Sequence, residues 1–549
     1  MNGKDWWRGA SIYQIYPRSF LDTNGDGVGD LKGATQMLDH VAWLGVDAVW
    51  LSPFYVSPMR DFGYDVSDHT AVDPLFGTGE DAERFIARAH ELGLKVMLDF
   101  VAGHTSDQHP WFVSSRSQRD GPHADWYHWA DPQPDGTPPN NWLSVFSGPA
   151  WAWEPRRRQY YLHHFLAQQP SLDTSNPAVQ DALLGIARFW LDRGVGGLRL
   201  DAIDFLAHDP LLRSNPASGI DPDQAPAKLF AMQKHDNDML HPGRMDFLQR
   251  LREVADAYGA VLLGEVSSQP GAFERIAEYT GPVGPLQTAY TLAPMRGAFD
   301  RAAAEGFARE AARADSWPCW AFSNHDTTRV ASRWCLTEGR VDRRKLELVA
   351  ALQMALRGQV CVYQGEELGL TDAELDLEHL RDPFGIAYWP EFKGRDGSRT
   401  PMPWRPGDAG LGFTAGKPWL PLGDGHAALT VEAQKEDWRS FLNRFQDLLQ
   451  WRRNTPEIRL GDLRPLALPE PLVGFERSYE GRRTLCVFNL SDARASLDLQ
   501  DGRGPIALDA WDYRLLSGSA AIAKPRGRQA VAWRTRQGDR RRLLDGGSP

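Results

Sequence analysis

The run Gly196-Gly197-Leu198-Arg199-Leu200-Asp201-Ala202-Ile203-Asp204 has the pattern of a short strand that ends at an acidic residue. Because side chains alternate between the two faces of a strand, Arg199 and Asp201 share one face. Leu198 and Leu200 lie on the other face, where we expect them to pack against helices. This arrangement favours a barrel over a sandwich. For this pair alone, a structural ion pair at a strand end is an interpretation of equal weight.

The same pattern recurs at three other places in the chain. Mainly apolar runs at 96–99, 261–265 and 320–326 also end in an acidic residue, namely Asp99, Glu265 and Asp326. In a barrel of parallel strands, the carboxyl ends of the strands meet at one mouth, where the chemistry of such folds takes place. Four acids that converge on one barrel mouth predict an active site.

The order of elements predicts an α/β fold. Helix-like segments at 31–44 and 80–92 alternate with strand-like segments at 46–51 and 94–101, joined by short links. This alternation is typical of a parallel sheet. Residues 104–173 interrupt it with a Trp-, Pro-, Asn- and Gly-rich stretch that is too long for a simple connection.

Four segments therefore make up the expected domain organisation. The first part of the barrel is residues 1–103, an inserted domain is 104–173, and the second part of the barrel is 174–457, with an irregular insertion at about 366–433. A C-terminal β domain is expected at 458–549, because helical periodicity ends there. Within it, 472–479 and 484–490 read as a hairpin joined across Glu480-Gly481.

Composition excludes several classes of protein. The 549 residues carry a net charge of −11, which argues against a nucleic-acid partner. A basic cluster at 534–542 reads as a solvated tail. No run of eighteen apolar residues occurs, so we expect no membrane segment. The four cysteines are scattered without metal-ligand spacing, which favours a reducing cytoplasm.

One loop near the N-terminus has the start of a calcium-binding pattern. Oxygen-bearing residues alternate from position 22, and Gly27 stands at the sixth position. It is not an EF-hand, because Gly33 occupies the twelfth position, where a bidentate glutamate is needed. A plain Asx/Gly turn is the alternative interpretation. The expected ligands of a structural calcium or magnesium ion are Asp22, Asn24, Asp26, the carbonyl of Val28, and Asp30.

The acid-ended strands, in their order and spacing, resemble those of glycoside hydrolase family 13, the α-amylase family, and within it the α-glucosidase and oligo-1,6-glucosidase branch. Four further motifs carry the same resemblance, which covers nearly the whole chain: QIYPRSF at 14–20, DFGYD at 61–65, YQGEELG at 363–369 and RTPMPW at 399–404. The resemblance implies a (β/α)8 TIM barrel with an inserted domain after the third strand and a C-terminal antiparallel β domain.

The resemblance also assigns roles. Asp201 would be the nucleophile, Glu265 the general acid and then base, and Asp326 the stabiliser of the transition state. No cofactor is expected for the chemistry. A retaining glycosidase needs one ionised and one protonated carboxyl group, and we expect Arg199 to keep Asp201 ionised while burial raises the pKa of Glu265. The implied substrate-binding residues are Asp61, Tyr64, Asp99, His104, Phe165, Arg199, Ala202, His325 and Arg399.

Asp61 and Arg399 are expected to pair and to close the site around one terminal glucose. At position 103, where much of the family has an asparagine that helps bind calcium, this chain has glycine. The resemblance therefore does not extend to calcium at that second position. Ala202 follows the nucleophile, and in the resembling enzymes alanine or threonine there goes with α-1,4 cleavage and valine with α-1,6 cleavage.

The implied activity is that of a monomeric or homodimeric α-glucosidase that releases α-glucose from the non-reducing end of short substrates, with α-1,4 linkages preferred and some transglucosylation. Expected substrates are maltose-type oligosaccharides, sucrose and aryl α-glucosides. The alternatives are an oligo-1,6-glucosidase, a sucrose isomerase or a dedicated glucosyl transferase. A non-catalytic, transporter-associated homologue would lack the carboxylates and would carry a membrane segment.

Overall fold

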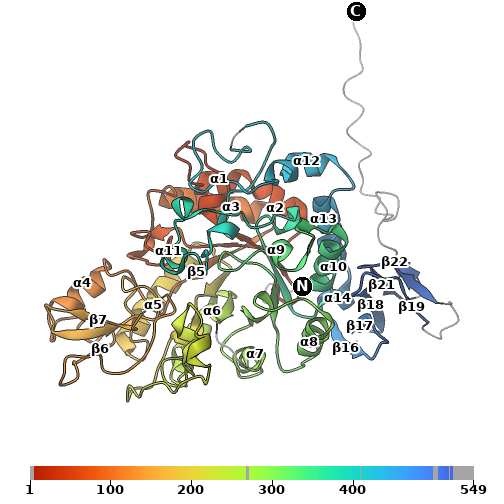
Figure 1. Ribbon diagram of the computed structural model, residues 1–549. Coiled ribbons are helices and arrows are strands. Elements are labelled where there is room, and N and C mark those ends of the chain that lie inside the picture. Colours follow the sequence, from red (N-terminus) through yellow and green to blue (C-terminus); the bar gives the residue numbers. More distant parts are fainter. Residues whose placement is uncertain are drawn as a thin grey trace, which may run out of the picture.

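The computed structural model describes residues 5–146, 148–267, 271–408, 410–498, 505–518 and 520–522. Eight parallel strands form its centre (Figure 1). In chain order these are β1 Ser11–Ile15, β2 Ala48–Leu51, β5 Lys95–Phe100, β9 Gly197–Leu200, β10 Val261–Val266, β11 Thr288–Thr291, β12 Cys319–Ala321 and β15 Gln359–Tyr363. A parallel bridge between Ala289 and Pro318 brings β11 next to β12. The predicted TIM barrel is confirmed.

Side-chain alternation divides the apolar residues of the barrel into two sets. Trp50 belongs to the cluster that fills the barrel, whereas its neighbour Val49 packs in the larger cluster beneath the helices. Leu198 and Leu200 also pack beneath the helices. Arg199 lies between them in sequence and therefore points to the interior, as the period of two requires.

Helices surround the barrel (Figure 1). Their bounds are α1 Leu31–Gln36, α2 Leu38–Leu44, α3 Gly79–Glu91, α5 Pro177–Leu191, α6 Arg244–Tyr258, α7 Ala272–Thr280, α8 Arg301–Ala311, α9 Val330–Trp334, α10 Arg343–Ala355, α13 Phe441–Asn454 and α14 Pro456–Arg459. The expected single helix at 31–44 is wrong, because the backbone leaves helical geometry at Met37, with φ −92° and ψ 2°. Gly33 holds α1 against the chain at Leu21, where a Cβ atom would lie 2.0 Å from the carbonyl oxygen.

A small subdomain follows β5 and lies to one side of the barrel (Figure 1). It contains α4 Pro110–Ser117 and a three-stranded sheet of β6 Trp129–Ala130, β8 Gln159–Leu162 and β7 Trp151–Glu154. It has its own apolar cluster around Trp142 and Trp151. Before it, β3 Tyr55–Val56 and β4 Asp68–Val72 form a two-stranded sheet.

An antiparallel sheet lies at the other side of the barrel (Figure 1). Its order is β16 Asp462–Leu466, β17 Leu472–Tyr479, β18 Arg482–Asn489, β21 Tyr513–Ser517 and β22 Ala520–Ile522. A second pair, β19 Ala495–Leu497 and β20 Ile506–Leu508, accompanies it. The predicted C-terminal antiparallel fold is thus confirmed, although β18 begins two residues before the expected position 484. The basic cluster at 534–542 lies outside the described residues.

The remaining elements are short. A hairpin of β13 Leu336–Thr337 and β14 Arg340–Val341 precedes α10, and α11 Pro383–Tyr388 and α12 Val431–Glu436 interrupt the insertion after β15. The 3-10 turns are η1 Pro17–Ser19, η2 Ile203–Phe205, η3 Pro222–Gln224, η4 Leu229–Met232, η5 Ala293–Met295, η6 Glu366–Leu368, η7 Leu377–His379, η8 Asp396–Arg399 and η9 His426–Leu429. Among the described residues, no helix is long and apolar enough to cross a membrane.

Candidate active site

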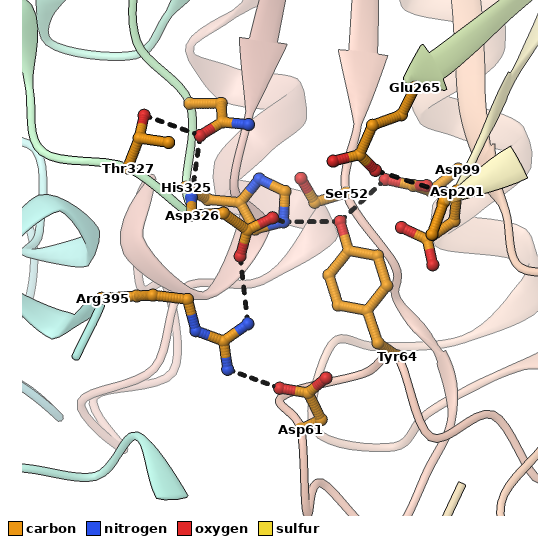
Figure 2. Close-up of polar contacts among 12 residues, drawn as sticks. Ser52, Asp61, Tyr64, Asp99, Asp201, Glu265, His325, Asp326, Thr327 and Arg395 are labelled. Carbon is orange, nitrogen blue, oxygen red and sulfur yellow. Dashed lines mark hydrogen bonds and ion pairs between the residues drawn. The ribbon is translucent and has the colours of Figure 1, made fainter. Parts of the chain in front are cut away.

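A cavity of about 520 Å³ opens at the carboxyl ends of the barrel strands. Its wall contains Asp201 after β9, Glu265 in β10 and Asp326 beyond β12 (Figure 2). The run at 320–326 is not a continuous strand, because β12 ends at Ala321 and Asp326 lies on the loop beyond it. Five other predicted residues also line the cavity: Asp61, Tyr64, His104, Phe165 and Ala202.

Arg199 joins three of the acids. Its side chain is fully buried and donates hydrogen bonds to Asp99 (Nη1 to Oδ1, 2.6 Å), to Asp201 (Nη1 to Oδ1, 2.8 Å) and to Glu265. It also donates to the hydroxyl of Tyr290 at 2.7 Å. One guanidinium therefore serves three carboxyl groups in a region with little water, which favours retention of a proton among them.

Burial favours a retained proton among these acids. It raises the pKa of Glu265 to about 8, that of Asp201 to about 7 and that of Asp99 to about 6, while Arg199 lowers all three. The expectation that Arg199 keeps Asp201 ionised is therefore not supported, because burial raises the pKa of Asp201 despite the ion pair. The predicted rise in the pKa of Glu265 through burial is found, and a proton kept on this group is what a general acid requires.

Asp326 is the acid that stays ionised. Burial opposes ionisation, but the charges of Arg395 and Arg399 hold the pKa of Asp326 well below its usual range. The Asp326 Oδ1 atom accepts from Arg395 Nη1 at 3.0 Å and from Arg399 Nη2 at 2.9 Å. A fixed negative charge at this wall is suited to stabilising a positively charged transition state.

The partner of Asp61 differs from the prediction. Arg395, not Arg399, pairs with Asp61, and the distance from Nη2 to Oδ1 is 2.7 Å (Figure 2). Arg395 also contacts Asp326 and the buried Asp382, and so holds two walls of the cavity together. Arg399 instead donates to the backbone carbonyl of His325.

Four of the predicted substrate-binding residues lie behind the cavity wall. Asp99, Arg199 and His325 are fully buried and Arg399 is 1% exposed; none of them lines the cavity. They hold the lining groups in place through a hydrogen-bond chain. Gln14 Nε2 donates to His325 Nδ1 (2.8 Å), His325 Nε2 lies 2.6 Å from the Tyr64 hydroxyl, and that hydroxyl donates to Asp99 (3.0 Å).

The two histidines are neutral. Burial lowers the pKa of both His104 and His325 to about 3. His104 Nε2 lies 3.1 Å from the carbonyl oxygen of Tyr64, and its ring packs against Phe165 with centroids 5.3 Å apart. Neutral imidazoles at these positions donate or accept hydrogen bonds without adding charge to the site.

Ala202 has a strained backbone at the site. Its φ of 39° lies in the left-handed region, and its N–H donates to Glu265 Oε2 at 3.3 Å. This conformation turns the chain away from β9 directly after Asp201 and brings the small side chain of Ala202 to the cavity wall.

Sequence reasoning missed the residues that loops contribute. Lys228, Arg296 and Arg395 line the cavity, and so do several aromatic rings: Phe146, Phe205, Phe230, Phe384 and Phe392. They come from the inserted subdomain, from the loops after β9 and β11, and from the insertion after β15. None belongs to a periodic segment, so only the richness of these loops in phenylalanine was available as a signal.

The predicted metal loop is held by hydrogen bonds of its own. Asp22 accepts from the N–H groups of Asn24 (2.9 Å), Gly25 (2.7 Å) and Gly27 (2.8 Å). Asp26 accepts from the N–H of Val28 at 2.8 Å. Asp30 is the N-cap of α1 and accepts from Gly33 N at 2.8 Å. These are the contacts of an Asx/Gly turn.

The fit of a cation to this loop is therefore partial. Among the described residues, only Asp376, Glu378 and His379, all exposed, bring three acidic, cysteine or histidine ligand atoms within 4.8 Å of one another. The carboxylates of the 22–30 loop do not converge that closely. Calcium or magnesium binding at this loop stays a prediction.

If the loop holds an ion, chelation should lower the melting temperature by several degrees, because a ligand that binds only the folded state stabilises it. The activity of the folded fraction should stay near normal, since none of the loop residues lines the cavity. Asp26→Asn is the matched variant, because it removes the charge of one predicted ligand at an exposed position. The amide oxygen that replaces the carboxylate can still accept the hydrogen bond from the N–H of Val28. A parent chain with the same melting temperature with and without chelator, and no metal by elemental analysis, would contradict the prediction.

A parallel barrel whose mouth gathers a buried acid pair around one arginine, with a third acid beside it, has the groups that a carbohydrate-cleaving enzyme of the two-carboxylate type requires. Residues 14–461 match the sequence model of the α-amylase catalytic domain. The chain belongs to glycoside hydrolase family 13, the α-amylase family, in the branch of the α-glucosidases and oligo-1,6-glucosidases.

Relatives and solved structures agree with this placement. A protein named "Probable alpha-glucosidase" from Rhizobium meliloti is 50% identical over 90% of this chain and 91% of its own length. The oligo-1,6-glucosidase of Heyndrickxia coagulans is 35% identical over 95% of this chain and 98% of its own. The crystal structure of the alpha-glucosyl transfer enzyme XgtA superposes with a TM-score of 0.89 at 48% identity, covering 93% of this chain and 99% of that one.

The trehalulose synthase from Pseudomonas mesoacidophila MX-45 has a TM-score of 0.83 at 30% identity, over 93% of this chain and 99% of its own. By their names, these proteins are two glucosidases, a glucosyl transfer enzyme and a trehalulose synthase. The chain is therefore a glycoside hydrolase enzyme of this family, either a glucosidase or a glucosyl transferase.

Proposed function

We propose that the protein is a retaining, exo-acting α-glucosidase that releases α-glucose from the non-reducing end of short α-glucosides and also transfers glucose to acceptors. The observation that carries this proposal is the shared contact of Asp201 and Glu265 with Arg199 at the cavity wall. Two carboxyl groups with different proton affinities in one enclosed site are what double displacement requires.

The proposed reaction has two steps. Glu265 donates its proton to the glycosidic oxygen while Asp201 attacks the anomeric carbon, so the bond to the leaving group breaks and a glucosyl ester of Asp201 forms. Glu265, now ionised, then takes a proton from water, which attacks the same carbon and releases Asp201. Asp326 offsets the positive charge that develops on the sugar in both transition states.

Asp61 and Arg395 support an exo-acting site. Their buried ion pair, together with Asp382, forms a closed wall beside Asp326. A terminal glucose offers hydroxyl groups to such a pair, whereas a longer chain has no passage through it. We therefore propose short substrates, namely maltose-type oligosaccharides, sucrose and aryl α-glucosides, in a monomer or homodimer of the cytoplasm. The cytoplasmic assignment is supported by the four cysteines, all free and buried.

A product profile tests the proposed function. On maltose, the first new product should be α-glucose, detected as the α anomer by NMR before mutarotation. Rates should fall from disaccharides to soluble starch, and starch viscosity should drop only slowly as glucose appears. A rapid fall in viscosity before any glucose is released would show internal cleavage and would overturn the exo-acting proposal.

A dedicated glucosyl transferase is the second candidate, favoured by the similarity to XgtA over nearly the whole chain. The apolar rings that line the cavity also suit an acceptor that displaces water. The ratio of glucose released to glucose transferred, measured with maltose across a range of concentrations, separates the two candidates. Hydrolysis that dominates at low maltose supports the glucosidase, and transfer that dominates throughout supports the transferase.

Linkage preference should depend on Ala202. We expect maltose or sucrose to be preferred to isomaltose in kcat/KM, and Ala202→Val to shift the preference toward isomaltose by about tenfold, within the range for a methylene or so in a pocket. Ala202→Thr is the matched control, because threonine has the same branched shape and the same strain at positive φ. It should keep the α-1,4 preference, because a polar hydroxyl replaces one of the two methyl groups of valine. A parent enzyme that prefers isomaltose would mean that Ala202 is not the determinant.

A further inference from the structure

Two cations line the active-site cavity without an acidic partner. Lys228 lies on the loop after β9 and Arg296 follows η5 beyond β11; among the described residues, neither makes an ion pair or a side-chain hydrogen bond. The third cation of the wall, Arg395, is bound to three carboxylates. Lys228 and Arg296 therefore take no part in the ion pairs found within the described part of the chain.

Lys228 is held in place by aromatic rings. Its ammonium nitrogen lies 3.2 Å from the ring centroid of Phe392 and 4.1 Å from that of Phe384. Burial and the charges of Arg296 and Arg395 lower the pKa of Lys228 to about 8, against the opposing charge of Asp382. Lys228 and Arg296 line the same cavity, so an anion bound there would be attracted by both charges.

Exposure places this pair at the opening of the cavity. Arg296 is exposed and Lys228 is half-buried, whereas Asp61, Glu265 and Arg395 are buried. In a pocket that closes around one terminal glucose, the leaving group faces the opening. The glucose side is occupied by Asp61 and Arg395. The acids of the cavity thus surround the site of the sugar. The two unpaired cations and the phenylalanine rings lie where the aglycone or acceptor would bind.

We propose that Lys228 and Arg296 select aromatic aglycones and acceptors that carry a carboxylate. The phenylalanine rings Phe230, Phe384 and Phe392 cover the flat ring of such a group, and the two cations bind its carboxylate. This inference rests on the proposed α-glucosidase function and specifies the substrate class of the same site. The competing explanation is that Lys228 is only a tether between the loop after β9 and the insertion that contains α11.

The test compares two substrates of nearly equal shape, 4-carboxyphenyl α-glucoside and its neutral amide, 4-carbamoylphenyl α-glucoside. The quantity measured is the ratio of their kcat/KM values, carboxylate over amide. In the parent this ratio should be about fivefold above one at low salt and should fall as ionic strength rises, because the cations are partly exposed. Lys228→Met and Arg296→Met should each lower it about twofold to threefold, and the double variant should bring it near one.

Lys228→Arg and Arg296→Lys keep the charges and should keep most of the ratio. If Lys228→Met slows both glucosides by the same factor and leaves the ratio at the parent value, Lys228 is a tether and the proposal is overturned. A ratio at or below one in the parent also overturns it. Failure of the parent to hydrolyse either glucoside or maltose would instead count against the α-glucosidase function itself.

Discussion

Replacing Asp201 by asparagine should reduce the hydrolysis of maltose and of 4-nitrophenyl α-glucoside on the order of 10⁴-fold, because no glucosyl ester can form at that position. The fold should survive, since an amide oxygen at residue 201 can still accept the hydrogen bond from Arg199. Burial raises the pKa of Asp201, so the substitution also removes a carboxyl group that resists ionisation and should not lower the melting temperature.

Two observations make this expectation specific to the nucleophile. Asp181→Asn removes the same charge from the surface of α5, where the side chain is 69% exposed, and should leave activity unchanged. Mass spectrometry of the parent, quenched during turnover, should find one glucosyl group on the peptide that contains residues 196–204. A glucosyl adduct that persists in purified Asp201→Asn, or activity above a few per cent of the parent, would contradict the assignment.

The sequence predicted the parts of the site that depend on strand geometry. Alternation placed Arg199 and Asp201 on one side of the predicted strand, and in the structure Arg199 joins Asp201 to Glu265 through its hydrogen bonds to both. The carboxyl ends of parallel strands meet at one edge whatever the lengths of the connections. The prediction of a shared site therefore did not depend on how far apart the acids lie in the sequence. This is why acids more than sixty residues apart in sequence could be assigned to one site.

What the sequence did not predict depends on loops and burial. Asp61 and Arg395 are 334 positions apart. Arg395 and Arg399 both reach Asp326 Oδ1, so the choice of partner for Asp61 depends on the irregular insertion after β15, whose course has no periodic pattern in the sequence. Burial of Asp201 likewise cannot be read from its neighbours in sequence, because the loop after β9 and the inserted subdomain together enclose the cavity.

Replacing Glu265 by glutamine should separate the two steps of the proposed reaction. With maltose, whose leaving group is a poor one, kcat/KM should fall by about 10²–10⁴-fold, the contribution usual for general acid catalysis. With 4-nitrophenyl α-glucoside, which departs without a proton, the fall in the first step should be much smaller, and added azide should restore turnover by attacking the glucosyl ester without a base. Equal losses on both substrates, with no effect of azide, would mean that Glu265 is not the acid and base.

The pH dependence of the parent and of Glu265→Gln supplies an independent check. Because the pKa of Glu265 is raised to about 8 by burial, kcat/KM of the parent should decline as the pH rises through about 8, when the general acid loses its proton. That decline should be absent from Glu265→Gln on 4-nitrophenyl α-glucoside.

The stability of the folded protein should also depend on pH through Glu265, and it should fall as the pH rises. A carboxyl group whose folded pKa lies above its unfolded value of about 4.3 stabilises the fold below that value and loses the contribution as the pH rises to about 8. Glutamine does not titrate, so the melting temperature of Glu265→Gln should exceed that of the parent by an amount that grows from pH 5 to pH 8, and a constant difference would show that Glu265 is ionised throughout this range.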